Sequence, residues 1–247
     1  MDDKDFKASL KAISGATHYD SLWESFISSL GKVGVDLISY HHIAPHHSPD
    51  SGRIDILTYG YPSVWETFCR NENLSAYNPV FNMAYTRTDV FRWSEILDQP
   101  PKSEPESKFI RTLKEWMKGD GFIIPVFGPS GRNGYVAAGN LASIEDWTVN
   151  CLQQIKSLSQ DFHLRYVAFR LSELPSDFSV NDDDHKILSE IAEGKGLQSI
   201  SADLDISPEK ITATIDKLML TMGVSDLASL MIRANSLGLI KSVDSVD

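Results

Sequence analysis

A chain of 247 residues has room for two domains of ordinary size, and its 42% of apolar and 10% of aromatic residues are typical of a globular protein. The net charge of −11 argues against a protein that coats nucleic acid along its whole length. No apolar run approaches the roughly 18 residues of a membrane-spanning helix, and the charged opening MDDKDFKASL lacks the apolar stretch of a secretory signal. We therefore expect a cytoplasmic protein with no membrane partner.

The first third of the chain predicts helices followed by strands. Two helices are expected to open it, the second with apolar residues at helical spacing over 22–30 and a stop at Gly34. The segments 35–43 and 53–60 then have the character of strands. The Pro-, His- and Ser-rich segment between them, 44–52, predicts a loop.

Three further helices and two strands are expected along the middle of the chain. A short helix over 64–70 comes first, and in the next one Asn78 is a suitable N-cap with Pro79 at the first helical position. An amphipathic helix over 103–119 follows. The segments 121–128 and 134–141 then predict two strands joined by the turn PSGRN.

A long helix is expected to start at Ser143, with Asp146 completing a pair that resembles a capping box. An apolar seam runs along this helix through Cys151, Ile155, Leu158, Phe162 and Phe169. Two roles for the seam stay open, because it could cover the sheet or form a face shared between two copies of the chain.

Strands mixed with helices in this way predict an α/β/α sandwich with a mainly antiparallel sheet. Beyond Pro175 the pattern becomes entirely helical. We therefore expect an α+β protein with an N-terminal domain over 1–170, a linker over 171–178 and an all-α domain over 179–247.

No pattern in the chain points to catalysis or to a resident cofactor. We find no GxSxG, paired-carboxylate, phosphate-loop or Cys/His arrangement, so an enzyme is not expected. Four histidines gather near one loop: His41, His42, His46 and His47. Adjacent histidines on a strand point to opposite faces, and no acidic or Cys ligand accompanies them closely, so we predict no metal site. Cys69 and Cys151 lack CxxC spacing, which argues against a disulfide framework.

Beyond the linker, short helices are joined by tight turns. One helix ends in AEGK at 192–195, and the segment 197–204 is followed by the turn DIS and a helix over 207–222. Ser207 can cap that helix, with Pro208 at its first position. Short helices joined at this spacing are the sequence sign of a helix-turn-helix.

The set AEGK, IS, GVS and GLI, in this order, resembles the LuxR-type DNA-binding domain over residues 178–241, with 208–222 as the recognition helix. The resemblance implies DNA contacts by four side chains: Lys210, Thr212, Thr214 and Lys217. This sequence departs from the family, whose members generally spread basic or hydrogen-bonding side chains along that helix. Here Glu209 and Asp216 cancel the two lysines.

The C-terminal segment is also the more acidic part of the chain. Residues 177–247 hold 13 acids and 6 bases, a net of −7, whereas the remainder holds 21 acids and 17 bases, a net of −4. Few cations are thus available to neutralise phosphates, which disfavours DNA binding. Asp182, Asp183 and Asp184 would face a phosphate backbone poorly, although a favourable interaction with a helix N-terminus is an alternative reason for them.

The stretch 59–93, together with GFIIPV, resembles the autoinducer-binding domain of the same family. In that family an N-acyl-homoserine lactone is held by a Trp, an Asp and a Tyr, and a second Trp packs on its ring. The resemblance implies a pocket built from seven residues: Tyr61, Trp65, Cys69, Asn78, Trp93, Gly121 and Asn140.

Two of those positions depart from the family pattern, because Asn78 stands at the Asp position and Cys69 at the Tyr position. An amide lacks the charge of a carboxylate, and a thiol is a poor replacement for a phenol. Asn78, Trp65 and Trp93 also have purely structural readings, as an N-cap and as core residues. The ligand is therefore expected to be an acyl-homoserine lactone or another small apolar molecule.

Three functions stay open at this stage. The first is a quorum-sensing-type regulator that binds DNA as a homodimer. The second is an anti-activator that has lost DNA binding and forms heterodimers with a related LuxR-type activator. The third is a sensor that folds without a lactone or binds another ligand.

Overall fold

The computed structural model describes residues 1–44, 53–65, 67, 78–116, 120–140, 147–173 and 180–240. The chain divides into two compact units. Met1–Ile43 and Arg53–Leu171 form the first, called here the N-terminal unit, and the second, the C-terminal unit, includes Ser172–Asp247. Each unit is described by itself.

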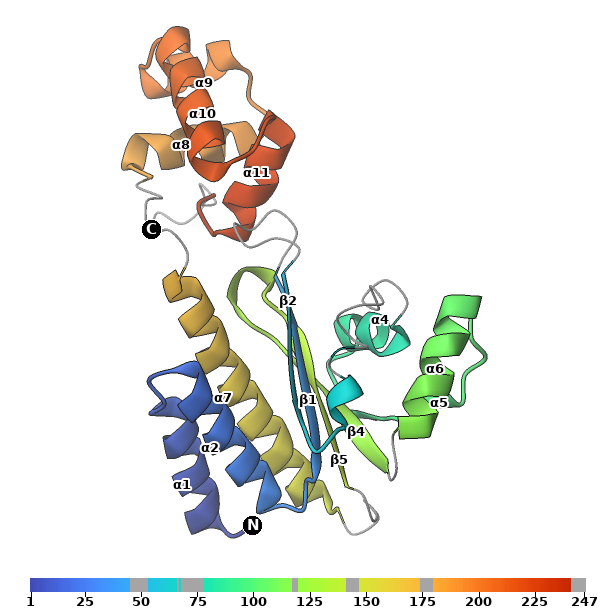
Figure 1. Ribbon diagram of the computed structural model, residues 1–247. Helices are drawn as coiled ribbons and strands as arrows, with labels where there is room; N and C mark the ends of the chain where they lie inside the picture. The colour runs from blue at the N-terminus through green and yellow to red at the C-terminus, as the bar shows by residue number, and fades with distance from the viewer. Residues whose placement is uncertain are drawn as a thin grey trace. The chain divides into compact units, whose positions relative to one another are not determined.

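A five-stranded sheet forms the middle layer of the N-terminal unit (Figure 1). Its strands lie in the order β2-β1-β5-β4-β3, and every neighbouring pair is antiparallel, which confirms the predicted sheet type. The strands are β1 (Leu37–Ile43), β2 (Ile54–Tyr59), β3 (Phe91–Arg92), β4 (Asp120–Val126) and β5 (Gly134–Asn140). The two-residue strand β3 was not predicted, because two residues are too few to show an alternating pattern.

Three helices cover one face of this sheet: α1 (Asp3–Ser14), α2 (Tyr19–Gly31) and α7 (Val149–Glu173) (Figure 1). The apolar core lies between these helices and alternate side chains of β1, β4 and β5. At its centre the rings of Phe26 and Phe162 stack 4.2 Å apart, and Tyr40 meets Phe162 edge-on. The predicted seam of α7 contributes to this core, so its role is to cover the sheet.

In the described segments, three shorter helices lie on the other face: α4 (Pro79–Thr86), α5 (Ser94–Leu97) and α6 (Glu104–Trp116) (Figure 1). The three layers confirm the predicted α/β/α sandwich. Asn78 caps α4 as expected, because its side-chain oxygen accepts the N–H of Val80 at 3.0 Å. The four-residue helix α5 was not predicted.

The long helix α7 starts later than its sequence suggests. Trp147 and Thr148 are not helical, and the helix begins at Val149 rather than at Ser143. The hydroxyl of Thr148 accepts the N–H of Cys151 at 3.2 Å, so Thr148 provides the N-terminal hydrogen bond that was expected from Ser143. Ser143 and Asp146 lie outside the described residues. In the described segments, no helix is both long and apolar enough to cross a membrane.

The described part of the C-terminal unit is helical, as predicted. It contains α8 (Asp182–Ala192), α9 (Leu197–Leu204), α10 (Pro208–Met222) and α11 (Leu227–Ser236). The turn between α9 and α10 contains Asp205 in the left-handed region, with a φ of 54°. Ser207 caps α10 through a hydrogen bond from the N–H of Lys210 at 3.3 Å. Leu188, Leu218 and Leu230 are buried where α8, α10 and α11 meet.

Candidate functional site

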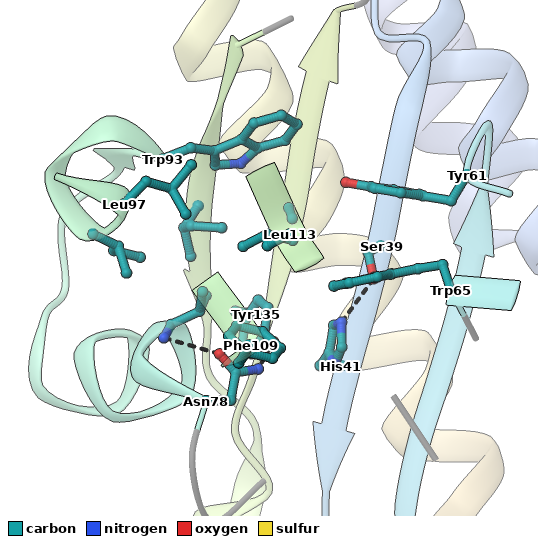
Figure 2. Close-up of a pocket in the computed structure, with 14 residues that line it drawn as sticks. Ser39, His41, Tyr61, Trp65, Asn78, Trp93, Leu97, Phe109, Leu113 and Tyr135 are labelled. Carbon is teal, nitrogen blue, oxygen red and sulfur yellow. Dashed lines mark hydrogen bonds between the residues drawn. The ribbon is translucent and has the colours of Figure 1, made fainter. Parts of the chain in front are cut away.

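A pocket lies between the sheet and the layer that contains α4, α5 and α6 (Figure 2). Its floor comes from alternate side chains of β1, β4 and β5, and its other walls come from the outer helices and the segment after β2. Among the described residues, five aromatic side chains line it: Tyr61, Trp65, Trp93, Phe109 and Tyr135. None of the described lining residues is Asp, Glu, Lys or Arg, and the cavity volume is about 30 Å³.

The structure brings together four of the seven predicted ligand-binding residues. Tyr61, Trp65, Asn78 and Trp93 all line the pocket. The rings of Tyr61 and Trp65 stack with their centroids 5.7 Å apart. Cys69 lies outside the described residues, so its position stays a prediction.

Gly121 does not line the pocket itself, but its lack of a side chain leaves space for Trp93, which does line the pocket. Gly121 and Gly139 pair across β4 and β5. A Cβ atom on Gly121 would lie 2.5 Å from the Trp93 ring, and one on Gly139 would lie 2.3 Å from it. The two glycines together form the flat surface on which the Trp93 indole rests. Gly139 was not predicted, although its alternation with Ala137 on one strand face was visible in the sequence.

We expect Gly139→Ala to destabilise the N-terminal unit by about 1–3 kcal/mol, the usual cost of overpacking. The added methyl group would force Trp93 out of its place above the sheet. Chemical unfolding followed by tryptophan fluorescence measures the change. The matched control is Gly31→Ala at the end of α2, where a Cβ atom would meet nothing within 4 Å. If Trp93 is the obstacle, the smaller ring of Trp93→Phe should recover part of the loss; no recovery would contradict this explanation.

Asn78 is buried and already has two hydrogen bonds. Its oxygen caps α4, and its Nδ2 donates to the hydroxyl of Tyr135 at 3.1 Å. The structural reading of Asn78 as an N-cap is therefore correct. Its place in the pocket wall still allows the remaining lone pair of the oxygen to accept a hydrogen bond from a ligand.

Asn140 does not lie in the pocket, which corrects the expectation for this residue. Residues of β5 alternate between the two faces, and Tyr135 and Ala137 face the pocket whereas Val136 and Ala138 face the α2–α7 layer. Asn140 continues the alternation of Val136 and Ala138 along the strand, so it lies on the same face of β5 as these two residues. Its Nδ2 donates to the carbonyl oxygen of Gly34 at 2.6 Å, so it fixes the turn after α2.

Ser39 and His41 are pocket residues that the sequence reading missed. They lie two positions apart on β1, so both face the pocket, and they are 2% and 6% exposed. Ser39 Oγ and His41 Nε2 are 2.7 Å apart. Burial lowers the pKa of His41 to about 3, so its imidazole is neutral near pH 7. The His41 ring also stacks on Tyr135, with centroids 4.5 Å apart.

A buried ionic cluster lies on the other face of β1. His42 pairs with Asp55 across β1 and β2, with His42 Nδ1 and Asp55 Oδ2 3.3 Å apart. Arg53 and Arg170 approach the same carboxylate at 2.8 Å and 3.6 Å. Burial alone would raise the pKa of Asp55, but the hydrogen bonds from His42 and Arg53 and the nearby arginine charges outweigh it and bring the pKa to about 2.

The Asp55 cluster corrects the expectation that no acidic residue accompanies the histidines. His41 and His42 do point to opposite faces of β1, as a strand requires. Within the described segments, no group of three or more His, Cys, Asp or Glu side chains could hold a metal ion. His46 and His47 lie outside those segments.

The four predicted DNA-contact residues all lie on α10, and the side chains of three of them have partners within the C-terminal unit. Lys217 Nζ is 3.0 Å from Asp184 Oδ2, and Lys210 Nζ is 3.8 Å from Asp183 Oδ2. Thr212 is exposed and donates its hydroxyl to the carbonyl of Pro208 at 3.0 Å. Thr214 is half-buried. Both lysines therefore have a carboxylate from the first turn of α8 as an ion-pair partner.

Comparison with known proteins identifies the N-terminal unit. The family model of the autoinducer-binding domain matches residues 19–166. The protein y4qH of Sinorhizobium fredii, named as an HTH-type transcriptional regulator, is 23% identical over 241 residues, covering 94% of this chain and 72% of that protein. The crystal structure of Escherichia coli SdiA matches with a TM-score of 0.77 and 16% identity over 96% of this chain and 98% of that one.

A second SdiA structure, in complex with octanoyl-rac-glycerol, matches with a TM-score of 0.75 and 16% identity over 98% of this chain and 99% of that one. These structural matches show that the fold is shared. Since the family model covers more than half of the chain, the protein belongs to the family that carries an autoinducer-binding domain.

Proposed function

We propose that this protein is a quorum-sensing-type regulator that responds to a small, uncharged and mainly apolar molecule and binds DNA as a homodimer through α10. The observation that carries the sensing part is the pocket itself. Aromatic walls with a few converging polar groups are the usual composition of a small-molecule site. The octanoylglycerol bound by SdiA is a molecule of this chemical class.

The size of the cavity sets a condition on binding. About 30 Å³ is space for a few water molecules, whereas ligand pockets usually measure about 300–1,000 Å³. A ligand with an octanoyl chain therefore has to displace lining side chains. The described lining side chains that belong to the short outer helices are Val80 on α4, Ile96 and Leu97 on α5, and Phe109 and Leu113 on α6.

We expect octanoylglycerol to raise the unfolding temperature of the N-terminal unit and the octanoate anion to have no effect at the same concentration. A ligand at 100 times its Kd adds about 2.7 kcal/mol to the free energy of unfolding. The octanoate carboxylate would lose its hydration without meeting a cation, since no described lining residue is positively charged. Thermal unfolding followed by tryptophan fluorescence measures both. Stabilisation by octanoate alone would contradict an uncharged ligand.

The second candidate function is an anti-activator that does not bind DNA and pairs with a related LuxR-type activator. The contacts of α10 favour it. DNA affinity comes largely from cations that neutralise phosphates, and Lys210 and Lys217 are already paired with Asp183 and Asp184. A mixed dimer with such a chain would present one competent half instead of two.

One double substitution tests whether the carboxylate partners of Lys210 and Lys217 weaken DNA binding. In the Asp183→Asn, Asp184→Asn variant both lysines lose their carboxylate partners, while the amide of residue 184 still offers an oxygen to the N–H of Asn181. We expect a steeper dependence of DNA affinity on salt, by about 0.9 per freed lysine in the slope of log K against log salt concentration. Fluorescence anisotropy with random duplexes measures it.

The matched control is Asp182→Asn, Asp205→Asn, which removes two exposed acids of the same unit that have no ion pair among the described residues. An equal gain in this control would show that net charge matters and pairing does not. Specific retention of an operator by the unmodified protein at nanomolar concentration would reject the anti-activator. No retention, together with co-purification of an activator, would support it.

A further inference from the structure

The Ser39–His41 pair is the least expected polar feature of the pocket. Both side chains project from β1 toward the cavity, on the side of Tyr61 and Trp65 and across the pocket from Trp93 (Figure 2). Their neighbours on the same face of the sheet include Leu37, Ala137 and Ile123, which are apolar. Two apolar residues would therefore be the simplest way to build this wall.

Hydrogen-bond counting shows that the pair has one donor left over. A serine hydroxyl and a neutral imidazole each supply one donor, and a single bond of 2.7 Å joins them. If the hydroxyl donates to Nε2, the imidazole proton is on Nδ1; if Nε2 donates, the hydroxyl proton is free. Within the described segments neither side chain has another hydrogen-bond partner.

A buried donor without a partner costs free energy, so the pair is suited to a ligand that supplies an acceptor. The position of that donor is well defined. His41 is held between its bond to Ser39 and its stack on Tyr135, whose hydroxyl in turn accepts the Nδ2–H of Asn78. Trp93, which is 3% exposed, supplies a second buried donor across the cavity, because its Nε1 has no partner within the described segments.

We propose that Ser39 and His41 form a second polar subsite of the pocket, which donates a hydrogen bond to a hydroxyl or keto oxygen of an uncharged amphiphilic ligand. This inference rests on the proposed sensing function. It implies a ligand with two separated polar groups, one near Trp93 and one at β1, joined by apolar atoms that contact the aromatic walls.

The test compares 1-octanoyl-rac-glycerol with methyl octanoate, which has the same acyl ester but lacks the two hydroxyls. We expect the full-length protein to bind octanoylglycerol roughly 3- to 10-fold more tightly, the effect of about one net hydrogen bond. Ser39→Ala and His41→Phe should remove most of this preference while keeping affinity for methyl octanoate. His41→Phe retains an aromatic ring to stack on Tyr135, which limits damage to the fold.

The control is Ser159→Ala, which removes a buried hydroxyl from α7 on the other face of the sheet. It should leave the preference unchanged. The ¹⁵N shifts of the His41 ring provide a direct readout, and they should move with octanoylglycerol more than with methyl octanoate.

Three results are decisive. Loss of the preference in both variants, with the control unchanged, supports the subsite. An equal loss of affinity for both probes, or an unchanged preference, overturns the subsite and leaves the sensing pocket standing. If neither probe stabilises the protein up to its solubility limit, the proposed sensing function fails, and the subsite fails with it.

Discussion

The N-terminal unit should lose several kcal/mol of stability between pH 6.5 and pH 4. Burial lowers the pKa of His41 to about 3 and that of His163 to about 4, whereas an unfolded histidine has a pKa of about 6.5. The unfolded state therefore binds protons first as the pH falls. The stability that these neutral histidines contribute is complete above pH 6.5 and is lost toward their folded pKa values.

The size of the loss follows from the two shifts. Each pKa unit corresponds to about 1.4 kcal/mol, so at pH 4 each histidine has lowered the free energy of unfolding by about 3 kcal/mol. Asp55, with a pKa of about 2, adds a smaller loss between about pH 4 and pH 2, because its pKa is depressed in the folded state. A total of about 6 kcal/mol at pH 4 is comparable to the whole stability of many domains.

His163 is fixed as a neutral ring by its two partners. The carbonyl oxygen of Arg132 can only accept, so Nε2 carries the proton that it donates at 2.8 Å. Nδ1 then accepts the hydroxyl proton of Tyr40 at 2.9 Å. Protonating Nδ1 would break this second bond inside the core, which is why acid should act on the fold here.

Tryptophan fluorescence during urea unfolding at successive pH values measures the effect. All five tryptophans of the chain precede residue 171, so the signal reports the N-terminal unit. His41→Phe should remove about half of the dependence between pH 6.5 and 4. A free energy of unfolding that is constant from pH 7 to pH 4 would contradict the buried neutral state of both histidines.

The second large effect concerns lactone recognition. We expect the unmodified protein to bind common N-acyl-homoserine lactones weakly, and Asn78→Asp with Cys69→Tyr to increase the affinity roughly 30- to 1,000-fold. A charge-assisted bond and a phenol contact together correspond to about 2–4 kcal/mol. The structure supports the feasibility of the first change, because an Asp at position 78 still has one oxygen to cap α4 and a second for a ligand N–H.

The two single variants show how much of the gain in lactone affinity comes from each substitution. Asn78→Asp should account for the charge-assisted part, and the hydroxyl of Tyr135, which now accepts from Asn78, can donate to the new carboxylate. Asn82→Asp, on the same helix but not lining the pocket, adds the same charge and should have no effect. Calorimetric titration with N-octanoyl-homoserine lactone decides the question. Tight binding by the unmodified protein would show that the two departures from the family pattern do not weaken recognition.

Local patterns in the sequence were sufficient for much of the fold. Strands β1, β2, β4 and β5 were visible as short apolar runs between turn residues, and the caps Asn78 and Ser207 were visible as polar residues before proline. The pocket was visible only through a family resemblance, because its residues come from strands and helices that are distant in sequence. Its contents depend on which side chains of each strand face it, and the resemblance alone placed Asn140 in the pocket although its side chain donates to Gly34.

Contacts between charged residues that are distant in the chain could not be predicted from the sequence. Asp55 meets His42 through strand pairing and Arg170 through the packing of α7, and no local pattern relates these three positions. The same holds for Lys217 and Asp184, which are 33 residues apart. Net charge pointed to poor DNA binding, but only the structure shows which acid neutralises which lysine.

The strand β1 carries consecutive residues that belong to different sites. His41 lines the cavity, and His42, bonded to it through one peptide unit, contacts the Asp55 cluster on the opposite face. That cluster includes Arg170, three residues before the last residue of α7. The cavity and the arginine near the end of α7 are therefore connected through one peptide unit of β1 and the Asp55 carboxylate. Thermodynamic linkage is reciprocal, so whatever free energy couples the protonation of Asp55 to the occupancy of the cavity acts equally in both directions.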